Sequence, residues 1–405
     1  MRVAVVNQHP SDVVGGSELQ CDLVARALAS RGHDVHYLAV TRDHVRRPDP
    51  AVPYAIHRVP TQAEEIVQAC AKLNVDAVYW RMNRLLLPPV VKGLAAHHIP
   101  LVFAIADSDD VARWRRSPWP RGVGPRDLVH ELRVRISHRR SWAAFRWVAG
   151  IASQRADFIG RVPVAQQRVV RNLMVTEEAP FAWPRPYVAW VGRLQQRKRP
   201  ELLPAIADAV APFGVDVLVA GQVREDRYRS LLGPPTVRSN LHHVGVLPQA
   251  QVVGLLRSAR ALVMTAHEEG FANVLLQSWW HGTPTVSLGY DPDGLMARSE
   301  LGTNCGDDTD LFLERVAEVA ALEDEARSAR RVAIRDVART EFDEERTIAA
   351  LEDLLRSVGQ RGEGQPARRS AIGRPVLPAE LEPAWWAFLD CCDVLEGGRR
   401  VLLGV

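Results

Sequence analysis

The hydrophobic positions near the start of the chain predict a strand, a helix and a second strand. Residues 2–7 form a short valine-rich run, as expected for a buried strand. A helix that ends at Arg31-Gly32 follows, because apolar residues recur at helical spacing: Leu19, Leu23, Val24, Ala27 and Leu28. Residues 34–40 form the next apolar run. A strand, a helix and a strand within so short a stretch make a βαβ unit, which predicts a parallel sheet.

The same alternation continues in two series. In the first series we expect strands at 75–80 and 100–105, with a helix near 86–97. Residues 173–186 contain three prolines and indicate a linker. The second series then begins, with strands expected at 187–192, 215–221, 261–266 and 283–288, and helices at 199–214, 249–260, 273–282 and within 309–358.

This organisation predicts an α/β fold with two Rossmann-like, doubly wound domains facing a central cleft. We place the N-terminal domain at residues 1–176 and the C-terminal domain at 177–358. In such sheets ligands bind beyond the carboxyl ends of the strands. Residues 359–405 differ: a polar part rich in Gly, Arg and Pro predicts a flexible tether. The end of the chain predicts an amphipathic helix that docks on the body or on a partner.

Composition fits this picture and excludes several classes of protein. The chain of 405 residues suits two domains of about 150–200 residues each. A hydrophobic content of 47% and a charged content of 24% are ordinary for a soluble globular protein. We find no signal peptide and no run that could span a membrane. The scattered cysteines give neither a disulfide framework nor zinc-site spacing, so the cytoplasm is the expected compartment.

Two glycines, Gly15 and Gly16, precede the first helix in the run GGSE. Glycine lets the backbone approach a ligand closely, and a helix N-terminus favours an anion. An ordinary loop that needs positive φ angles explains these residues equally well. No GxGxxG motif follows the first strand, which argues against a dinucleotide site.

A basic loop, VGRLQQRKRPELL, follows the first strand of the second series. Arg193 offers a guanidinium fork and Lys198 a point charge, and such a pair can clamp a diphosphate. The competing interpretation is a solvated basic loop, since Arg197 and Arg199 lie in it too. Lys198 draws attention because the chain has only two other lysines, Lys72 and Lys92.

The stretch AHEEGFANVLLQSWWHG places glutamates between a predicted strand and a predicted helix. The amides of Phe271, Ala272 and Asn273 lie at the helix N-terminus, where they can donate to a phosphate or to sugar hydroxyls. Glu269 can accept from vicinal hydroxyls, and Gln277 follows along the helix. The simpler explanation of the glutamates is favourable charge at a helix N-terminus, and that of Gln277 is an unremarkable polar position.

In this order, the three motifs resemble those of retaining glycosyltransferases of the GT-B fold, family 4. The resemblance covers roughly residues 1–358. It implies a nucleoside-diphosphate sugar as the donor substrate, bound mainly by the C-terminal domain, with the acceptor on the N-terminal side. It also implies that no metal or other cofactor is needed.

The resemblance further implies roles for individual residues. Arg193 and Lys198 match the basic pair on the diphosphate. Glu269 matches the first glutamate of the Glu-x7-Glu signature, which reads the sugar hydroxyls, and Gln277 falls at the second, which holds the ribose. The other donor-binding positions that it implies are Gly15, Gly16, Gly245, Val246, Gly270, Phe271, Ala272 and Asn273.

Gln277 departs from that signature. A glutamine carbonyl still accepts from a ribose hydroxyl, but the charge-assisted gain of about 1 kcal/mol is lost. We therefore expect Gln277 to tune donor affinity rather than to abolish activity. Many members use an N-terminal-domain histidine beside the sugar; this chain offers Asp107 or Asp109 instead, and we choose Asp107 as the catalytic candidate. Capping of the next turn is the alternative role for Asp107.

The segment 113–147 suggests where the acceptor side contacts its surroundings. Many arginines there are interleaved with aromatic residues: Trp114, Trp119, Trp142, Phe145 and Trp147. Such a composition suits an anionic membrane surface or a lipid-diphosphate acceptor. A solvated helix with buried tryptophans explains it equally well. We expect no nucleic-acid partner, because no nucleic-acid-binding module is recognisable. The acceptor is left open among glycans, glycolipids and natural products.

Three other functions fit parts of this pattern. The first is another enzyme on the same fold, such as a sugar phosphorylase or an epimerase. The second is a sugar-nucleotide-binding protein without catalysis, for which Gln277 is the hint. The third is a polymer- or partner-binding protein that acts through residues 359–405.

Overall fold

The computed structural model describes residues 1–13, 15–41, 50–82, 84–113, 125–175, 177–232 and 239–359. The chain divides into two compact units, Met1–Ala367 and Arg368–Val405. All described residues lie in the first unit. The predicted tether and tail helix beyond Gly359 lie outside the described residues, as do Trp114 and Trp119.

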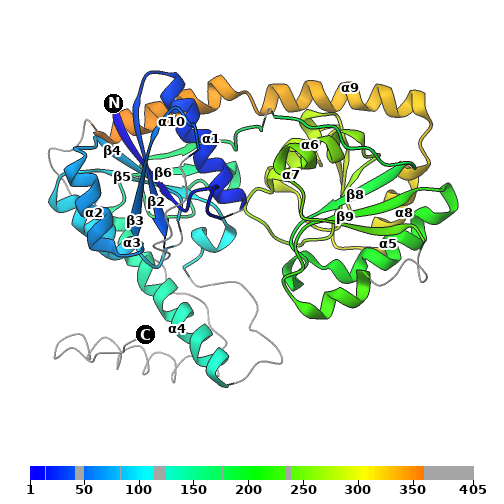
Figure 1. Cartoon of the computed structure of the whole chain (residues 1–405), viewed down its shortest axis with the longest axis horizontal. Helices are drawn as coiled ribbons and strands as arrows, with labels where there is room; N and C mark the ends of the chain where they lie inside the picture. Colours follow the sequence, from blue (N-terminus) through cyan, green and yellow to red (C-terminus); the bar gives the residue numbers. More distant parts are fainter. Residues whose placement is uncertain are drawn as a thin grey trace. The chain divides into compact units, whose positions relative to one another are not determined.

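The first sheet contains seven parallel strands in the order β3-β2-β1-β4-β5-β6-β7 (Figure 1). The strands are β1 (Arg2–Asn7), β2 (Asp34–Thr41), β3 (Ala55–Pro60), β4 (Ala77–Trp80), β5 (Leu101–Ile105), β6 (Gly150–Ser153) and β7 (Gln167–Val169). The chain order reverses at β1 and β4, so the first strand lies inside the sheet.

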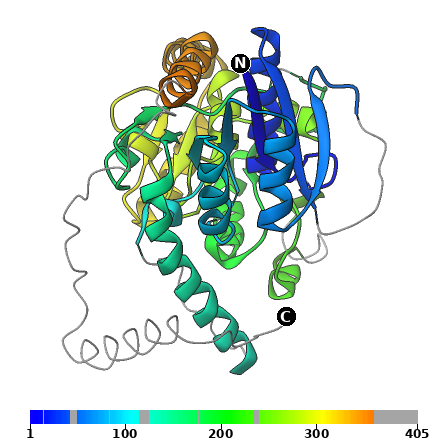
Figure 2. The ribbon, with the colours of Figure 1, turned by 90° about the vertical axis from the view of Figure 1, so that its left-hand side faces the viewer.

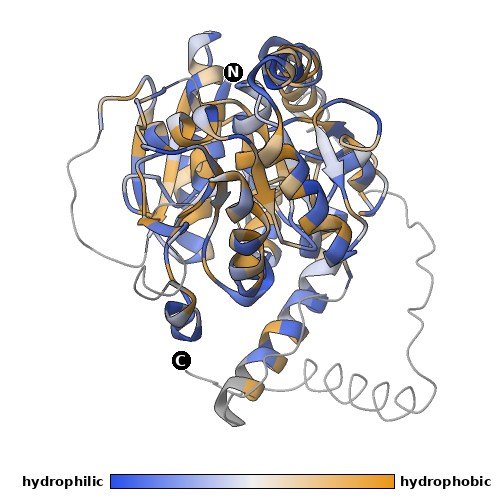
Figure 3. Cartoon of the chain, turned by 90° about the vertical axis from the view of Figure 1, so that its right-hand side faces the viewer, coloured by the Kyte–Doolittle hydropathy of each residue, from blue (hydrophilic) through white to orange (hydrophobic). Residues whose placement is uncertain are grey.

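Helices cover both faces of this sheet, which is why most of its strands are apolar on both sides. On one face, α2 (Ala63–Lys72) and α3 (Leu87–Ala96) enclose a core that includes Trp80 and Phe103. On the other face, α1 (Gly16–Ser30) and α10 (Glu344–Gly359) enclose a core that includes Tyr37 and Tyr79. Helix α4 (Pro125–Trp142) extends away from the strands (Figures 1 and 2), and polar and apolar positions are interleaved along it (Figure 3).

The second sheet contains six parallel strands in the order β10-β9-β8-β11-β12-β13. These are β8 (Tyr187–Val191), β9 (Asp216–Ala220), β10 (Leu241–Gly245), β11 (Leu262–Met264), β12 (Thr285–Ser287) and β13 (Gly302–Asn304). One face packs against α6 (Gln249–Ser258), α7 (Asn273–Trp280) and α9 (Asp324–Glu341). The other packs against α5 (Leu203–Val210) and α8 (Thr309–Ala321). The predicted α/β fold with two doubly wound sheets is therefore confirmed.

Helix α10 returns to the first sheet after the second sheet is complete. Its apolar face, Ile348, Leu351, Leu354, Leu355 and Val358, belongs to the same core as Tyr37 and Tyr79. The sequence pattern placed this helix in the range 177–358, with the second series. The helix fits the first sheet closely, since a Cβ atom on Gly150 of β6 would lie 2.9 Å from Cδ1 of Leu354.

Candidate functional site

A cavity of about 560 Å³ lies at the carboxyl ends of strands from both sheets. From the first sheet it is lined by the loop after β1, by residues that follow β5, and by Arg81 and Gln154, which follow β4 and β6. From the second sheet it is lined by the loop after β8, by residues that follow β9 and β10, and by the start of α7. Of the sequence-predicted site residues, all except Gly245 line this cavity.

Lys198 and Glu269 form an ion pair inside the cavity. The Lys198 Nζ atom lies 2.7 Å from Oε1 of Glu269, and both side chains are mostly buried. Lys198 ends the short 3₁₀ turn Gln196–Lys198, and Arg199 follows in the left-handed region with a φ of 49°. The Lys198 carbonyl also accepts a hydrogen bond from the Thr265 hydroxyl beyond β11. The backbone of this turn is therefore fixed, and the ammonium group faces the helix α7 side of the cavity.

Arg193 lies beside the glycine loop that follows β1. A Cβ atom on Gly15 would lie 3.5 Å from Nη2 of Arg193 and only 2.0 Å from Oε2 of Glu18. Any larger residue at position 15 would therefore displace the Glu18 side chain. The loop after β1 and the loop after β8 consequently approach each other across the cavity, with the guanidinium between them.

Asp107 caps a turn and also pairs with Arg197 from the second sheet. Its Oδ1 atom accepts from the backbone N–H of Asp109 at 3.2 Å, and it begins the 3₁₀ turn Ser108–Val111. Its two carboxylate oxygens also accept from Arg197, at 2.7 and 3.0 Å. Although burial opposes ionisation, the Arg197 guanidinium holds the pKa of Asp107 below its usual value. Capping, the alternative interpretation of the sequence, is thus present, and Arg197, although partly exposed, is paired with Asp107.

The start of α7 is held closely against the first sheet. A Cβ atom on Gly270 would lie 1.9 Å from the carbonyl oxygen of Ala106, so only glycine allows this approach. The side chain of Asn273 donates to the carbonyl of Gly16 at 3.1 Å and accepts from Asn172 at 2.7 Å. Asn273 therefore ties the glycine loop to the helix N-terminus.

Gln277 lies deeper in α7 and faces the same cavity. The residue is only 2% exposed, and its Oε1 atom has no hydrogen-bond donor among the described residues. A buried amide oxygen without a donor is unfavourable in an empty site and is available to a ligand hydroxyl. Phe271 and Ala272 also line the cavity, but most of each residue is buried in the core between the sheet and α9.

Gly245 and Val246 lie at the end of β10. Gly245 has a φ of 78°, and its carbonyl accepts from the backbone N–H of Gly221 at 2.7 Å. Val246 lines the cavity and is largely exposed, whereas Gly245 does not line it. The glycine therefore shapes the turn that presents Val246.

Sequence reasoning missed a buried polar network in the wall of the cavity. Nη2 of Arg81 donates to Oε1 of Gln154 at 2.7 Å and to Oδ1 of Asn172 at 3.1 Å. Gln154 in turn donates to the carbonyl of Ala106 at 3.0 Å. The sequence could have indicated these residues by position, because Arg81 directly follows β4 and Gln154 directly follows β6. Their partners come from distant segments, which spacing alone does not reveal.

Within the described ranges, no group of three or more His, Cys, Asp and Glu side chains could hold a metal ion. In that same part of the chain, no helix combines the length and the apolar character that crossing a bilayer requires.

Comparison with known proteins identifies a family over the second sheet and a fold over nearly the whole described chain. Residues 185–322 match the family model described as glycosyl transferases group 1. No curated protein matches the sequence.

Three solved structures are similar to this chain. Anabaena HepE, solved in complex with UDP and glucose, is 16% identical with a TM-score of 0.63, over 88% of this chain and 100% of its own. Sucrose-phosphate synthase from Thermosynechococcus elongatus is 17% identical with a TM-score of 0.69, over 88% and 99%. WaaG, a glycosyltransferase involved in lipopolysaccharide biosynthesis, is 17% identical with a TM-score of 0.60, over 88% and 99%. The chain therefore has the GT-B fold, and its residues 185–322 match glycosyl transferases group 1.

Proposed function

We propose that this protein transfers a sugar from a nucleoside-diphosphate sugar to an acceptor hydroxyl, with retention of anomeric configuration and without a metal cofactor. The observation that carries the proposal is the Lys198–Glu269 ion pair, which faces a cavity that Arg193 also lines. The match to glycosyl transferases group 1 over this part of the chain supports it. The UDP complexes of HepE support a nucleotide sugar as the donor.

The donor diphosphate would bind to the side chains of Arg193 and Lys198. Arg193 presents a planar fork and Lys198 a point charge, and the two together neutralise the charge that develops on the leaving diphosphate. When Lys198 moves onto the phosphate, the Glu269 carboxylate is released to accept from sugar hydroxyls. The ion pair thus holds both side chains in place until the donor binds.

The reaction would proceed on the face of the sugar from which the diphosphate leaves. The bond between the anomeric carbon and the phosphate oxygen breaks, and a bond to the acceptor oxygen forms. The acceptor proton passes to the departing phosphate oxygen. Asp107, whose Oδ2 atom accepts from Arg197, lines the cavity and would assist this step.

A binding and turnover experiment tests this proposal. Calorimetric titration with a panel of nucleoside diphosphates and nucleotide sugars is expected to give binding of one base, lost in Lys198→Ala and weakened in Glu269→Gln. Product formed in the presence of EDTA should carry the same anomeric configuration as the donor. Absence of binding by every nucleotide sugar would overturn the proposal. Isomerised donor in the absence of any acceptor would favour the epimerase alternative.

For the acceptor side, we propose contact with an anionic lipid surface through α4 and the turn that follows it. Leu128, Val129 and Trp147 are exposed there, and arginines lie close by in the sequence. Trp142 and Phe145, in contrast, are buried around the Arg84 guanidinium, so they belong to the core. Salt-sensitive co-sedimentation with anionic vesicles is expected, reduced in Trp147→Ala but not in the buried-site variant Ser278→Ala. Equal sedimentation with neutral and anionic vesicles would contradict it.

A further inference from the structure

The loop after β6 reaches the backbone that carries Glu269. Gln154 and Arg155 are consecutive residues at the carboxyl end of β6, and they point to different targets. Gln154 lines the cavity, whereas the Arg155 guanidinium reaches the carbonyl oxygens of Glu269 and Gly270, at 3.3 and 3.5 Å. We propose that Arg155 is a positioning residue, which sets the Glu269 carboxylate in the donor site by holding the main-chain carbonyls of Glu269 and Gly270, directly after the Cα atom of Glu269. This inference rests on the function proposed above.

The guanidinium of Arg155 is itself held in place. Asp157 accepts from Nε at 2.8 Å and from Nη2 at 2.5 Å, which forms a two-point fork. The rings of Phe158 and Tyr290 lie 4.4 and 5.7 Å from the guanidinium carbon. Because two of its nitrogens are fixed on Asp157, the third, Nη1, has one available direction, and that direction leads to residues 269 and 270.

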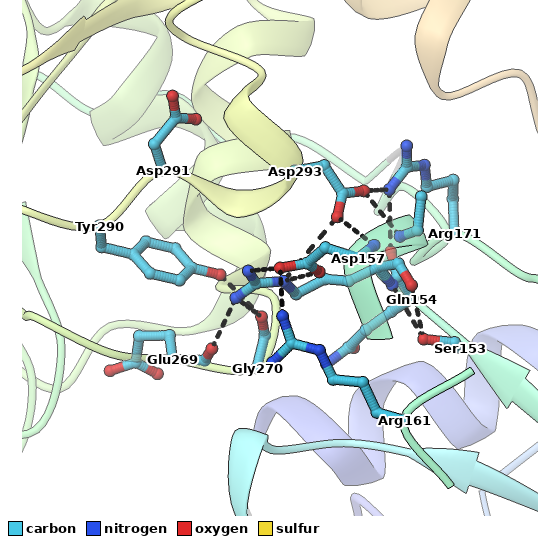
Figure 4. Close-up of polar contacts among 12 residues, drawn as sticks. Ser153, Gln154, Asp157, Arg161, Arg171, Glu269, Gly270, Tyr290, Asp291 and Asp293 are labelled. Atoms are coloured by element: carbon cyan, nitrogen blue, oxygen red, sulfur yellow. Dashed lines mark hydrogen bonds and ion pairs between the residues drawn. The ribbon is translucent and has the colours of Figure 1, made fainter. Parts of the chain in front are cut away.

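Tyr290 supports the same turn from the second sheet. Its hydroxyl donates to the carbonyl oxygen of Gly270 at 2.7 Å, and Figure 4 shows the ring directed at that residue. Gly270 also packs closely against the carbonyl of Ala106, which the absence of a Cβ atom permits. The turn is therefore held by donors from both sheets. Arg155 supplies the charged donor to the carbonyls of Glu269 and Gly270, whereas Arg197 donates to the preceding carbonyl of Glu268.

The loop that carries Arg155 is anchored to the second sheet by Asp293. The Asp293 carboxylate accepts from the backbone N–H groups of Ala156 and Asp157, at 2.9 and 3.1 Å, and pairs with Arg171. Figure 4 shows Asp293, Asp157 and Arg171 gathered on this side of the turn. Contacts thus run in both directions: the first sheet supplies Arg155 to the Glu269 turn, and the second sheet supplies Asp293 to the Arg155 turn.

If Arg155 positions Glu269, its loss should affect binding of the sugar but not binding of the nucleotide. Arg193 and Lys198, proposed for the diphosphate, come from the loop after β8, whereas the Arg155 guanidinium contacts Asp157 and the carbonyls of Glu269 and Gly270. Loss of Arg155 should therefore leave the affinity for a nucleoside diphosphate almost unchanged. It should reduce the additional affinity that the sugar contributes through Glu269. A residue needed only for folding would lower both affinities together.

The test is a double-mutant cycle between Arg155 and Glu269, measured by calorimetry with UDP and UDP-glucose, or with the base that the panel identifies. Arg155→Ala is expected to leave the UDP dissociation constant within about twofold and to weaken UDP-glucose by roughly five- to tenfold. Glu269→Gln should weaken UDP-glucose similarly, and the double variant should be no weaker than Glu269→Gln alone. Arg155→Lys, which keeps one charged donor, should recover part of the loss.

Arg161→Ala is the matched control, because Arg161 pairs with Asp157 and lies over the Phe158 ring of the same turn. It should alter neither dissociation constant. Additive losses from Arg155→Ala and Glu269→Gln, or equal losses for UDP and UDP-glucose, would overturn the inference while the proposed function stands. Failure of the unaltered protein to bind any nucleotide sugar would overturn both. If Arg155→Ala does not fold, the same comparison with Arg155→Lys decides.

Discussion

At the scale of single residues, Gln277 shows how one amide can set the affinity of a site. The residue is buried in α7, faces the cavity, and has an Oε1 atom without a donor among the described residues. A neutral oxygen in that position costs less in the empty site than a carboxylate would, since an isolated buried charge is strongly unfavourable. The glutamine therefore favours the stability of the empty protein over the strength of donor binding.

Gln277→Glu should tighten donor binding and destabilise the empty protein. A carboxylate gains about 1 kcal/mol from a ribose hydroxyl through charge assistance, which corresponds to roughly fivefold in the dissociation constant. Gln277→Ala should weaken donor binding by a similar factor. Calorimetric titration and urea unfolding measure the two effects.

Ser278→Ala provides the control for Gln277. Ser278 is equally buried in α7, but its hydroxyl donates to the carbonyl of Leu275 at 2.8 Å and it does not line the cavity. The affinity of the Ser278→Ala variant for the donor should therefore be unchanged. Unchanged affinity in both Gln277 variants would show that this position does not contact the donor.

Asp110 makes a second prediction at this scale, which concerns pH. Its carboxylate accepts from the backbone N–H groups of Ala106 and Asp107, at 2.9 and 3.1 Å. Burial raises the pKa of Asp110 to about 6, and the neighbouring Asp107 charge adds to the rise. Because the folded pKa lies above the unfolded value of 3.8, the folded state binds the proton more tightly. Asp110 therefore makes the protein less stable as pH rises from about 4 to about 6.

Asp110→Asn removes that titration and keeps an acceptor for both backbone groups. Compared with the variant, the unaltered protein should lose stability between pH 4 and pH 6 and change little above pH 7. Urea unfolding midpoints of the two proteins across this range give the comparison. Parallel pH curves for the two proteins would contradict the predicted proton uptake.

At the scale of elements, local pattern predicts which segments become helices and strands but not where a helix packs. The predicted strands at 2–7, 100–105 and 187–192 correspond to β1, β5 and β8, because their apolar runs are short, β-branched and buried. Strands β3 and β10 were missed, since exposed positions interrupt their patterns. Strands β7 and β13 were missed because none of their residues is buried, and the short buried strand β6 was missed as well.

Some helix boundaries also differ from the sequence-based prediction. The helix expected at 199–214 is α5 (Leu203–Val210) flanked by short 3₁₀ turns. Its first turn is 3₁₀ because Pro204 has no N–H to donate to the carbonyl of Pro200. The role of the aromatic and basic segment 113–147 was ambiguous in the sequence. Trp142 is buried and Trp147 is exposed, and composition alone does not distinguish the two.

Helix α10 allows a prediction about packing at the element scale. Leu354 is fully buried against the first sheet, so Leu354→Ala should lower the free energy of unfolding by about 2–4 kcal/mol. Gly150→Ala alone should also destabilise, by about 1–3 kcal/mol, because its Cβ would meet Leu354. In the Leu354→Ala background the closest contact is removed and only Cγ1 of Val358, at 3.2 Å, stays tight, so Gly150→Ala should destabilise clearly less than it does alone.

Asp353→Ala is the control for α10, since its side chain is exposed and should change stability by less than about 0.5 kcal/mol. Urea unfolding of the single and double variants gives the cycle. Fully additive losses for Gly150→Ala and Leu354→Ala would contradict the close contact between β6 and α10.

At the scale of the whole described chain, the candidate site could be predicted better than the contacts that assemble it. Arg193, Lys198 and Glu269 were found because each follows a strand, and parallel strands bring their carboxyl ends to one edge. Arg155, Arg171 and Asp293 were not found, because their contacts depend on how the two sheets meet. No spacing within either series encodes that arrangement.

The two sheets have separate cores, so their mutual contacts determine whether they unfold together. Asp293 is central to those contacts, with Ala156, Asp157 and Arg171 on the side of the first sheet. Although burial opposes it, the backbone N–H of Ala156 and the Arg171 guanidinium lower the pKa of Asp293 to about 2. Since the folded pKa lies below the unfolded value of 3.8, this contribution to stability is present above pH 4 and is lost as pH falls towards 2.

Asp293→Asn should therefore uncouple the two sheets at neutral pH. Asparagine tolerates the left-handed backbone at this position, where φ is 56°, but it removes the ion pair with Arg171. Calorimetry should show one thermal transition in the unaltered protein and a broadened or divided one in the variant. Asp291→Asn is the control, because Asp291 accepts only from Met296 and Ala297 of its own loop among the described contacts. A single sharp transition in Asp293→Asn, shifted no more than in Asp291→Asn, would mean that other contacts couple the sheets.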